Sequence, residues 1–218
     1  MSHHLVKLVL GAALVLAGGT VLAQPKAPAA EKPGAPGVKE LGMENAHAMC
    51  IGCHGIPGYK TAFPTTYHVP KIAGQQPGYI VSALKAYKSG ERSHPSMRGI
   101  ATSLTEDDMK KLAEYYGEPA KPQNKVAETK ADDKTVKEDK VKLCAACHGP
   151  DGNAPSAVDQ PVLAGQHRDY LERALTDYKI GRRKNPIMSG MAGQLSKQDI
   201  QDLAAWFSSQ KSHLHDQR

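Results

Sequence analysis

The chain has 218 residues, enough for one large domain or two small ones. Hydrophobic residues make up 40% but aromatic residues only 5%, so two small cores would be thin without an added bulky group. The excess of 28 Lys and Arg over 22 Asp and Glu is mild and forms no basic stripe, which argues against nucleic-acid binding.

The N-terminus is predicted to be an export signal. Lys7 precedes an apolar run from Leu8 to Ala17, and small residues end at Ala23 before Gln24. This pattern predicts a signal peptide over 1–23, cleaved after Ala23; the alternative is an uncleaved membrane anchor, for which the run is short. Export would place the chain in an oxidising compartment. A Pro- and Ala-rich stretch, 24–38, is predicted to be an extended tail.

The rest of the chain is a duplication. Cys50-Ile51-Gly52-Cys53-His54 recurs as Cys144-Ala145-Ala146-Cys147-His148. From Ala73 to Tyr116 the two copies align without a gap at an offset of 91, with 18 identities in 44 positions. We therefore expect two related domains, 39–118 and 137–212, joined by a polar linker over 119–136. The segment 56–69 is longer than its counterpart, and the sequence leaves its role open.

Each copy is predicted to be all-α. In the first copy, apolar positions from Tyr79 to Tyr87 repeat at helical spacing and stop at Gly90; in the second they run from Tyr170 to Tyr178 and stop at Gly181. The last helix of each copy is predicted to open at a capping box, and its apolar face indicates a core position for Met109. No convincing alternating strand pattern is present. The capping residues are Thr105 with Asp108, and Ser196 with Asp199.

The two Cys-x-x-Cys-His motifs predict covalent haem. Two cysteines of such a motif attach a c-type haem, and the adjacent histidine binds its iron. Cys50, Cys53, Cys144 and Cys147 are thus the predicted attachment points of two haem c groups, with His54 and His148 as iron ligands. A zinc ribbon needs more closely spaced cysteine pairs, a thioredoxin-like pair needs a βαβ context, and two disulfides would leave both histidines unexplained.

A methionine is the predicted sixth ligand of each iron, since Met with His raises the potential of an electron-transfer haem. The repeat selects Met97 and Met188, which align with each other and are expected in loops. Met191 is the alternative to Met188, but it aligns with Ile100, which cannot bind iron, and is better explained as a core filler.

Other residues near the motifs have weaker assignments. The backbone carbonyls at Pro70 and Pro161 are placed to orient the two histidines. Arg92 and Arg183 are candidates to pair with haem propionates, or else lie on a solvated face. A basic cluster before Met188 is a candidate contact for an acidic partner; it comprises Lys179, Arg182, Arg183 and Lys184.

With these motifs, the sequence resembles the cytochrome c4 family of dihaem class I c-type cytochromes over about residues 39–210. The resemblance rests on the two haem motifs, the Ala-Gly-Gln segments followed by Tyr79 and Tyr170, and the two Met-x-x-x-Ala-x-x-Leu stretches. It implies two cytochrome c domains related by a pseudo-twofold axis, periplasmic location with possible peripheral membrane association, and electron delivery toward a terminal oxidase.

Three functions compete. The first is a non-enzymatic electron carrier of a respiratory chain, taking electrons from a quinol-oxidising complex or another donor. The second is the dihaem electron-accepting subunit of an enzyme complex, such as a flavocytochrome sulfide dehydrogenase. The third is a dihaem redox enzyme, which would need an open iron site; both copies offer a methionine instead, which favours the carrier.

Overall fold

The computed structural model describes residues 42–62, 65–117 and 136–216, which all fall within one unit of the chain, 38–218. The predicted signal peptide (1–23), the tail (24–38) and the linker (119–136, apart from Val136) lie outside the described residues. Among the described residues, no helix combines the length and apolar content needed to cross a bilayer.

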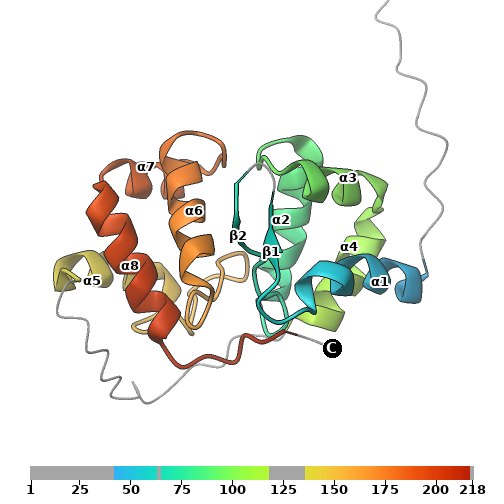
Figure 1. Cartoon of the computed structure of the whole chain (residues 1–218), viewed down its shortest axis with the longest axis horizontal. Helices are drawn as coiled ribbons and strands as arrows, with labels where there is room; N and C mark the ends of the chain where they lie inside the picture. The colour runs from blue at the N-terminus through green and yellow to red at the C-terminus, as the bar shows by residue number, and fades with distance from the viewer. Residues whose placement is uncertain (1–41, 63–64, 118–135, 217–218) are drawn as a thin grey trace, which may run out of the picture. The chain divides into compact units, whose positions relative to one another are not determined.

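The described residues of the first copy form four helices and a short two-stranded ribbon (Figure 1). Helix α2 packs against α3 and α4, and α1 packs against α4. The elements are α1 (Met43–His54), β1 (Lys60–Thr61), β2 (Tyr67–His68), α2 (Pro77–Ser89), α3 (Pro95–Ser103) and α4 (Glu106–Tyr116).

The second copy repeats the same helical arrangement. Helix α6 packs against α7 and α8, and α5 packs against α8. Each helix therefore has the partners that its counterpart has in the first copy, so the duplication seen in the sequence extends to tertiary packing. The elements are α5 (Glu138–His148), α6 (Arg168–Lys179), α7 (Pro186–Gly193) and α8 (Lys197–Ser209).

The predicted helix boundaries are confirmed where local chemistry fixes them. Helix α2 ends at Ser89, and the next residue, Gly90, has a φ of 85°, a left-handed conformation that glycine adopts without strain. Thr105 and Ser196 are the N-cap residues just before α4 and α8, and each forms a complete capping box with the aspartate three residues later. Met109 is 1% exposed, as expected for a core residue.

Two expectations about local structure were wrong. Met97 and Met188 lie in the first turn of short helices, α3 and α7, rather than in loops. Each helix has proline at its first position, where no backbone N–H is needed, and a side chain that caps it one residue earlier. The segment 56–69 also contains strands, since β1 and β2 pair antiparallel with Lys60 opposite His68.

Each copy has its own hydrophobic core. In the first copy Leu104, Met109 and Leu112 are at most 1% exposed, and Met97 packs against their cluster. In the second copy Leu203, Ala204 and Phe207 of α8 form the centre. The predominantly helical architecture confirms the predicted all-α fold class.

Candidate haem-binding sites

The Cys-x-x-Cys-His motifs occupy the C-terminal turns of matched helices. Cys50 and Cys53 lie on the last turns of α1, which ends at His54; Cys144 and Cys147 occupy the same places on α5, which ends at His148. Because residues three apart on a helix lie on one face, both sulfur atoms of each pair face the same side.

The chemistry of these cysteines fits covalent haem better than the alternatives. None of the four cysteines is in a disulfide. Burial, with Cys53 nearby, raises the pKa of Cys50 to about 11, and burial with Cys147 nearby does the same for Cys144. A redox-active pair needs a reactive thiolate, which these values disfavour. Among the described residues, no cluster of three or more His, Cys, Asp or Glu side chains could hold a metal ion such as zinc.

Both histidines are held in the orientation that an iron ligand needs. Nδ1 of His54 lies 2.7 Å from the carbonyl oxygen of Pro70, and Nδ1 of His148 lies 2.9 Å from that of Pro161. A carbonyl only accepts, so Nδ1 carries the proton and Nε2 keeps a lone pair. Burial lowers the pKa of both imidazoles, which favours the neutral form that binds metal.

The two methionines are equivalently placed. The backbone N–H of Met97 donates to Nδ1 of His94 at 3.3 Å, and that of Met188 donates to Oδ1 of Asn185 at 3.0 Å. Both methionine side chains are half-buried. Met191 lies three residues after Met188 on α7, hence on the same face, so the preference for Met188 still rests on the repeat.

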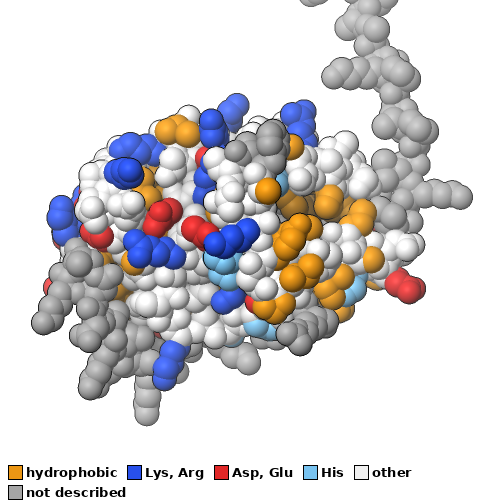
Figure 2. Space-filling model, viewed as in Figure 1, with side chains coloured by type: hydrophobic (Ala, Val, Ile, Leu, Met, Phe, Trp, Pro, Cys, Tyr) orange, Lys and Arg blue, Asp and Glu red, His pale blue; other side chains and the backbone are white. Residues whose placement is uncertain are grey.

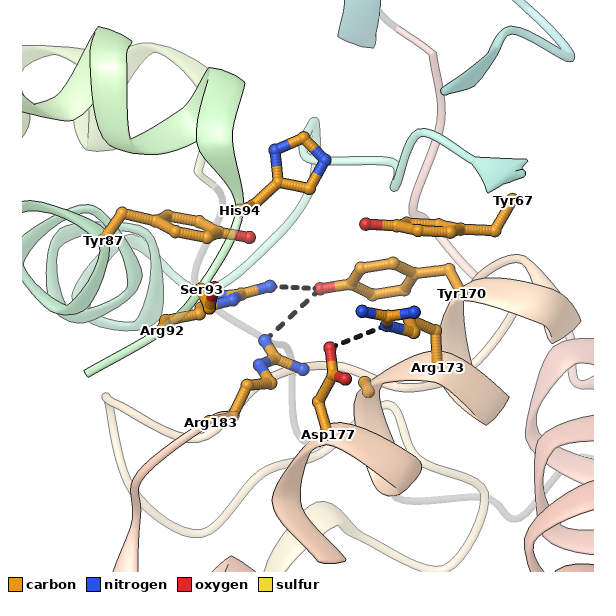
Figure 3. A pocket seen from close by; sticks show the side chains of 10 residues that line it. Tyr67, Tyr87, Arg92, Ser93, His94, Tyr170, Arg173, Asp177 and Arg183 are labelled. Atoms are coloured by element: carbon orange, nitrogen blue, oxygen red, sulfur yellow. Dashed lines mark hydrogen bonds and ion pairs between the residues drawn. The ribbon is translucent and has the colours of Figure 1, made fainter. Parts of the chain in front are cut away.

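Arg92 and Arg183 meet where the two copies join (Figure 3). Arg92 donates to the hydroxyls of Tyr170 at 2.5 Å and Tyr79 at 3.3 Å, and Arg183 donates to the same hydroxyls at 3.5 and 3.2 Å. Arg92 and Arg183 are only 8% and 5% exposed, so the alternative that they lie on a solvated face is wrong. Backbone hydrogen bonds join the loops beside them, from Ser93 to Arg182 and from Lys184 to Glu91.

This junction carries more positive charge than the described residues neutralise. No described carboxylate forms an ion pair with either guanidinium, and Nε of Arg183 is buried without a hydrogen-bond partner. Burial opposes ionisation of Tyr79, but Arg92 and Arg183 outweigh it and lower its pKa to about 7. Such a pair of buried cations favours an anionic group.

The described part of the segment 56–69, through Thr65 and strand β2, contacts α6 of the second copy. The backbone N–H and Nδ1 of His68 lie 3.1 and 2.8 Å from Oδ2 of Asp169, and Thr65 accepts a hydrogen bond from Arg173 at 2.8 Å. The ring of His68 stacks on that of His167, with centroids 4.6 Å apart. Thr65 and His68 of this segment therefore contribute to the contact between the two copies.

The basic cluster before Met188 is divided between buried and exposed residues. Arg183 is buried, and Nζ of Lys179 donates to the backbone carbonyl of Leu195. Lys179, Arg182 and Lys184 are all exposed, so three of the four residues of the cluster lie on the surface. On the face shown in Figure 2, Lys and Arg side chains are scattered rather than gathered, while hydrophobic side chains gather over the first copy.

Several site residues escaped sequence reasoning. Tyr79 and Tyr170 are assigned there only to helix faces and to the family resemblance, Lys179 only to the basic cluster, and Lys88 has no assigned role. All four are identical between the copies at the offset of 91, and this identity is the signal that could have identified them.

Comparisons with known proteins agree with this geometry. The Cytochrome c family model matches residues 138–211. The chain is 32% identical to cytochrome c4 of Pseudomonas aeruginosa over 170 residues, covering 73% of this chain and 82% of that protein. It is 30% identical to the thiosulfate dehydrogenase electron acceptor of Stutzerimonas stutzeri over 179 residues, covering 77% and 81%.

A solved structure of cytochrome c4 from Acidithiobacillus ferrooxidans is also similar. The TM-score is 0.57 at 31% identity, covering 74% of this chain and 98% of that one. With two complete attachment motifs, the chain carries two covalently bound haem c groups. It belongs to the cytochrome c4 family of dihaem electron-transfer proteins.

Proposed function

We propose that the chain is a periplasmic electron carrier in which a histidine and a methionine bind each haem iron. The observation that carries the proposal is the matched pair of hydrogen bonds from His54 to Pro70 and from His148 to Pro161, because they prepare both imidazoles for iron at equivalent places. Covalent attachment is assigned to Cys50, Cys53, Cys144 and Cys147.

Met97 and Met188 are the proposed second ligands. A haem iron with His and Met ligands cycles between ferric and ferrous states without binding substrate, and this supplies the one-electron chemistry of a carrier. An iron whose ligands both come from the protein has no open position for a substrate, and this disfavours a catalytic role. The residues of this chain then serve to fix the two ligands, exclude water and set the local charge.

Arg92 and Arg183 are proposed to receive haem propionates. The support is the buried pair of guanidinium groups without a described carboxylate, together with the unpartnered Nε of Arg183. A carboxylate there would supply the missing charge through strong hydrogen bonds. Both arginines lie at the joint between the copies, so this position would place one charged edge of each haem near the other copy.

Two classes of electron partner fit the chain. The first proposal is a quinol-oxidising complex as donor and a terminal oxidase as acceptor. The second is an enzyme that passes its electrons to this chain. Similarity to a protein named thiosulfate dehydrogenase electron acceptor favours an oxidoreductase of sulfur compounds as that enzyme. The similarity covers most of both chains, so it applies to the whole dihaem unit.

Purified oxidised protein distinguishes these proposals in a stopped-flow experiment. One arm adds thiosulfate with a purified thiosulfate dehydrogenase, and the other adds quinol with a purified quinol-oxidising complex. The carrier proposal predicts fast reduction by the second arm and fast reoxidation by a terminal oxidase. If only thiosulfate with its dehydrogenase reduces the protein rapidly, and the terminal oxidase does not reoxidise it, the carrier proposal is replaced by the acceptor proposal.

Periplasmic location is proposed from the N-terminal sequence. Cleavage after Ala23 predicts a mature protein that begins at Gln24. Mass spectrometry of the protein from a periplasmic extract measures this directly. An intact N-terminus found in the membrane fraction would indicate an uncleaved anchor instead.

A further inference from the structure

One lysine is retained by the duplication. Between Ala73 and Tyr116, Lys88 is the only lysine whose counterpart in the second copy, Lys179, is also a lysine. Nζ of Lys88 donates to the backbone carbonyl of Leu104 at 2.5 Å, and Nζ of Lys179 donates to that of Leu195. The acceptors are themselves 91 residues apart, so the same contact occurs in both copies.

Both carbonyls lie at the end of a methionine-bearing helix. Leu104 directly follows α3, and Leu195 lies two residues beyond the end of α7. Leu104 has none of its surface exposed and Leu195 only 6%, so their carbonyl groups have little access to water and need a protein donor. A positive charge is also favourable beside the C-terminus of a helix.

The lysines reach these carbonyls from the helix that supports the methionine helix. Lys88 lies in the last turn of α2, and Lys179 is the last residue of α6. Helix α2 packs against α3, and α6 against α7. Each short helix is therefore fixed twice, by a side-chain cap next to its methionine and by a lysine at its far end.

We propose that Lys88 and Lys179 are positioning residues that hold Met97 and Met188 in place as iron ligands. This inference rests on the proposed function, which assigns those methionines to the irons. Without the lysine, the C-terminal end of α3 or α7 loses its tether to α2 or α6. The state in which the methionine has left the iron then becomes more populated, and an external ligand gains access.

The test uses the variants Lys88→Met and Lys179→Met, which keep the aliphatic stem and remove the donor. Ferric protein is titrated with imidazole at pH 7 while the methionine–iron charge-transfer band is followed. Because apparent affinity scales with the population of the open state, loss of a charged hydrogen bond should raise it about tenfold. In each variant only half of the band's intensity should be lost at the lower imidazole concentrations, since the other copy keeps its lysine.

Lys85→Met is the matched control. Lys85 lies one turn earlier on α2. Its Nζ donates to Oε2 of Glu106 at 3.1 Å rather than to the backbone carbonyl of Leu104. The control removes the same charge and should titrate like the unmodified protein. Lys88→Arg restores a donor and should return the affinity of the first copy to its original value.

The outcomes separate this inference from the proposed function. If Met97→Leu and Met188→Leu leave the band intact, the ligand assignment fails. If each of them removes half of the band while both lysine variants titrate within twofold of the unmodified protein, the positioning role alone is overturned. An equal effect of Lys85→Met, or no recovery with Lys88→Arg, also overturns it, because the cause would then be charge or side-chain size.

Discussion

Asp169 joins the two copies, and its replacement tests how much that contact contributes to stability. Oδ2 of Asp169 accepts two hydrogen bonds from His68, at 3.1 Å from the backbone N–H and 2.8 Å from Nδ1. In Asp169→Asn, Oδ1 can still accept from the N–H of Tyr170, but an amide donor faces the N–H of His68. The variant therefore loses these two hydrogen bonds between the copies, while the side chain keeps its size and shape.

The size of the stability loss depends on how far water reaches the side chains of His68 and Asp169. Hydrogen bonds to a charged group contribute about 1.5–3 kcal/mol when well shielded. The side chains of His68 and Asp169 are 27% and 38% exposed, so water screens the pair. We expect a loss of roughly 1 kcal/mol in the free energy of unfolding, which lowers Tm by about 2–4 °C for a chain of this size.

The effect should depend on pH with a defined sign. Burial acts to raise the pKa of Asp169, but hydrogen bonds from His68 outweigh it and hold the pKa below its ordinary value of 3.8. A carboxylate with a lowered pKa stabilises the fold above its unfolded pKa, and this stability is lost as pH falls through the folded value. The difference between the two proteins should thus be full at pH 7 and should close as the pH falls below 3.8 and through the lowered pKa of Asp169.

Urea unfolding of the haem-loaded protein, followed by circular dichroism at pH 7 and at low pH, measures this difference. Asp159→Asn is the control, because Asp159 is an exposed acid in the second copy. Equal stability of Asp169→Asn and the unmodified protein at pH 7 would refute the reasoning. A difference that persists unchanged at low pH would also refute it.

Three further predictions address the haem sites and a helix cap. Met188→Leu should remove the methionine–iron band of one haem, whereas Met191→Leu should keep both; the reverse result would transfer the ligand role to Met191. Arg183→Gln should lower the reduction potential of a haem by roughly 50 mV, because loss of a nearby cation favours ferric iron; redox titration that finds a rise would contradict this. Ser196→Ala removes the N-cap of α8 and should cost about 1 kcal/mol in urea unfolding, with Ser189→Ala, in the middle of α7, as the uncapped control.

Much of the fold follows from short-range signals in the sequence. Apolar spacing from Tyr79 to Tyr87 and the glycine after it predict α2, because both act within a few residues. The capping boxes at Thr105 and Ser196 are equally local and are present as predicted. The sequence does not separate a loop from a short helix at Met97 and Met188, because the proline two residues earlier fits a loop as well as the first position of a helix.

The contacts between the copies could not be predicted from either copy alone. Arg92 and Tyr170 are 78 residues apart in sequence, and a hydrogen bond between them depends on how the copies dock. The ribbon of β1 and β2 has two residues in each strand, too few for alternation to show. His68 and Asp169 pair only because this ribbon lies on α6, which no local pattern encodes.

The central claim is that both irons are closed by a histidine and a methionine. Spectra of the purified protein, oxidised and reduced, with and without carbon monoxide, test it most directly. We expect a ferric methionine–iron band that corresponds to two haems, and no binding of carbon monoxide by either ferrous haem. Ready binding of carbon monoxide by one haem would contradict the assignment of Met97 or Met188 there and would make an enzymatic role the leading explanation.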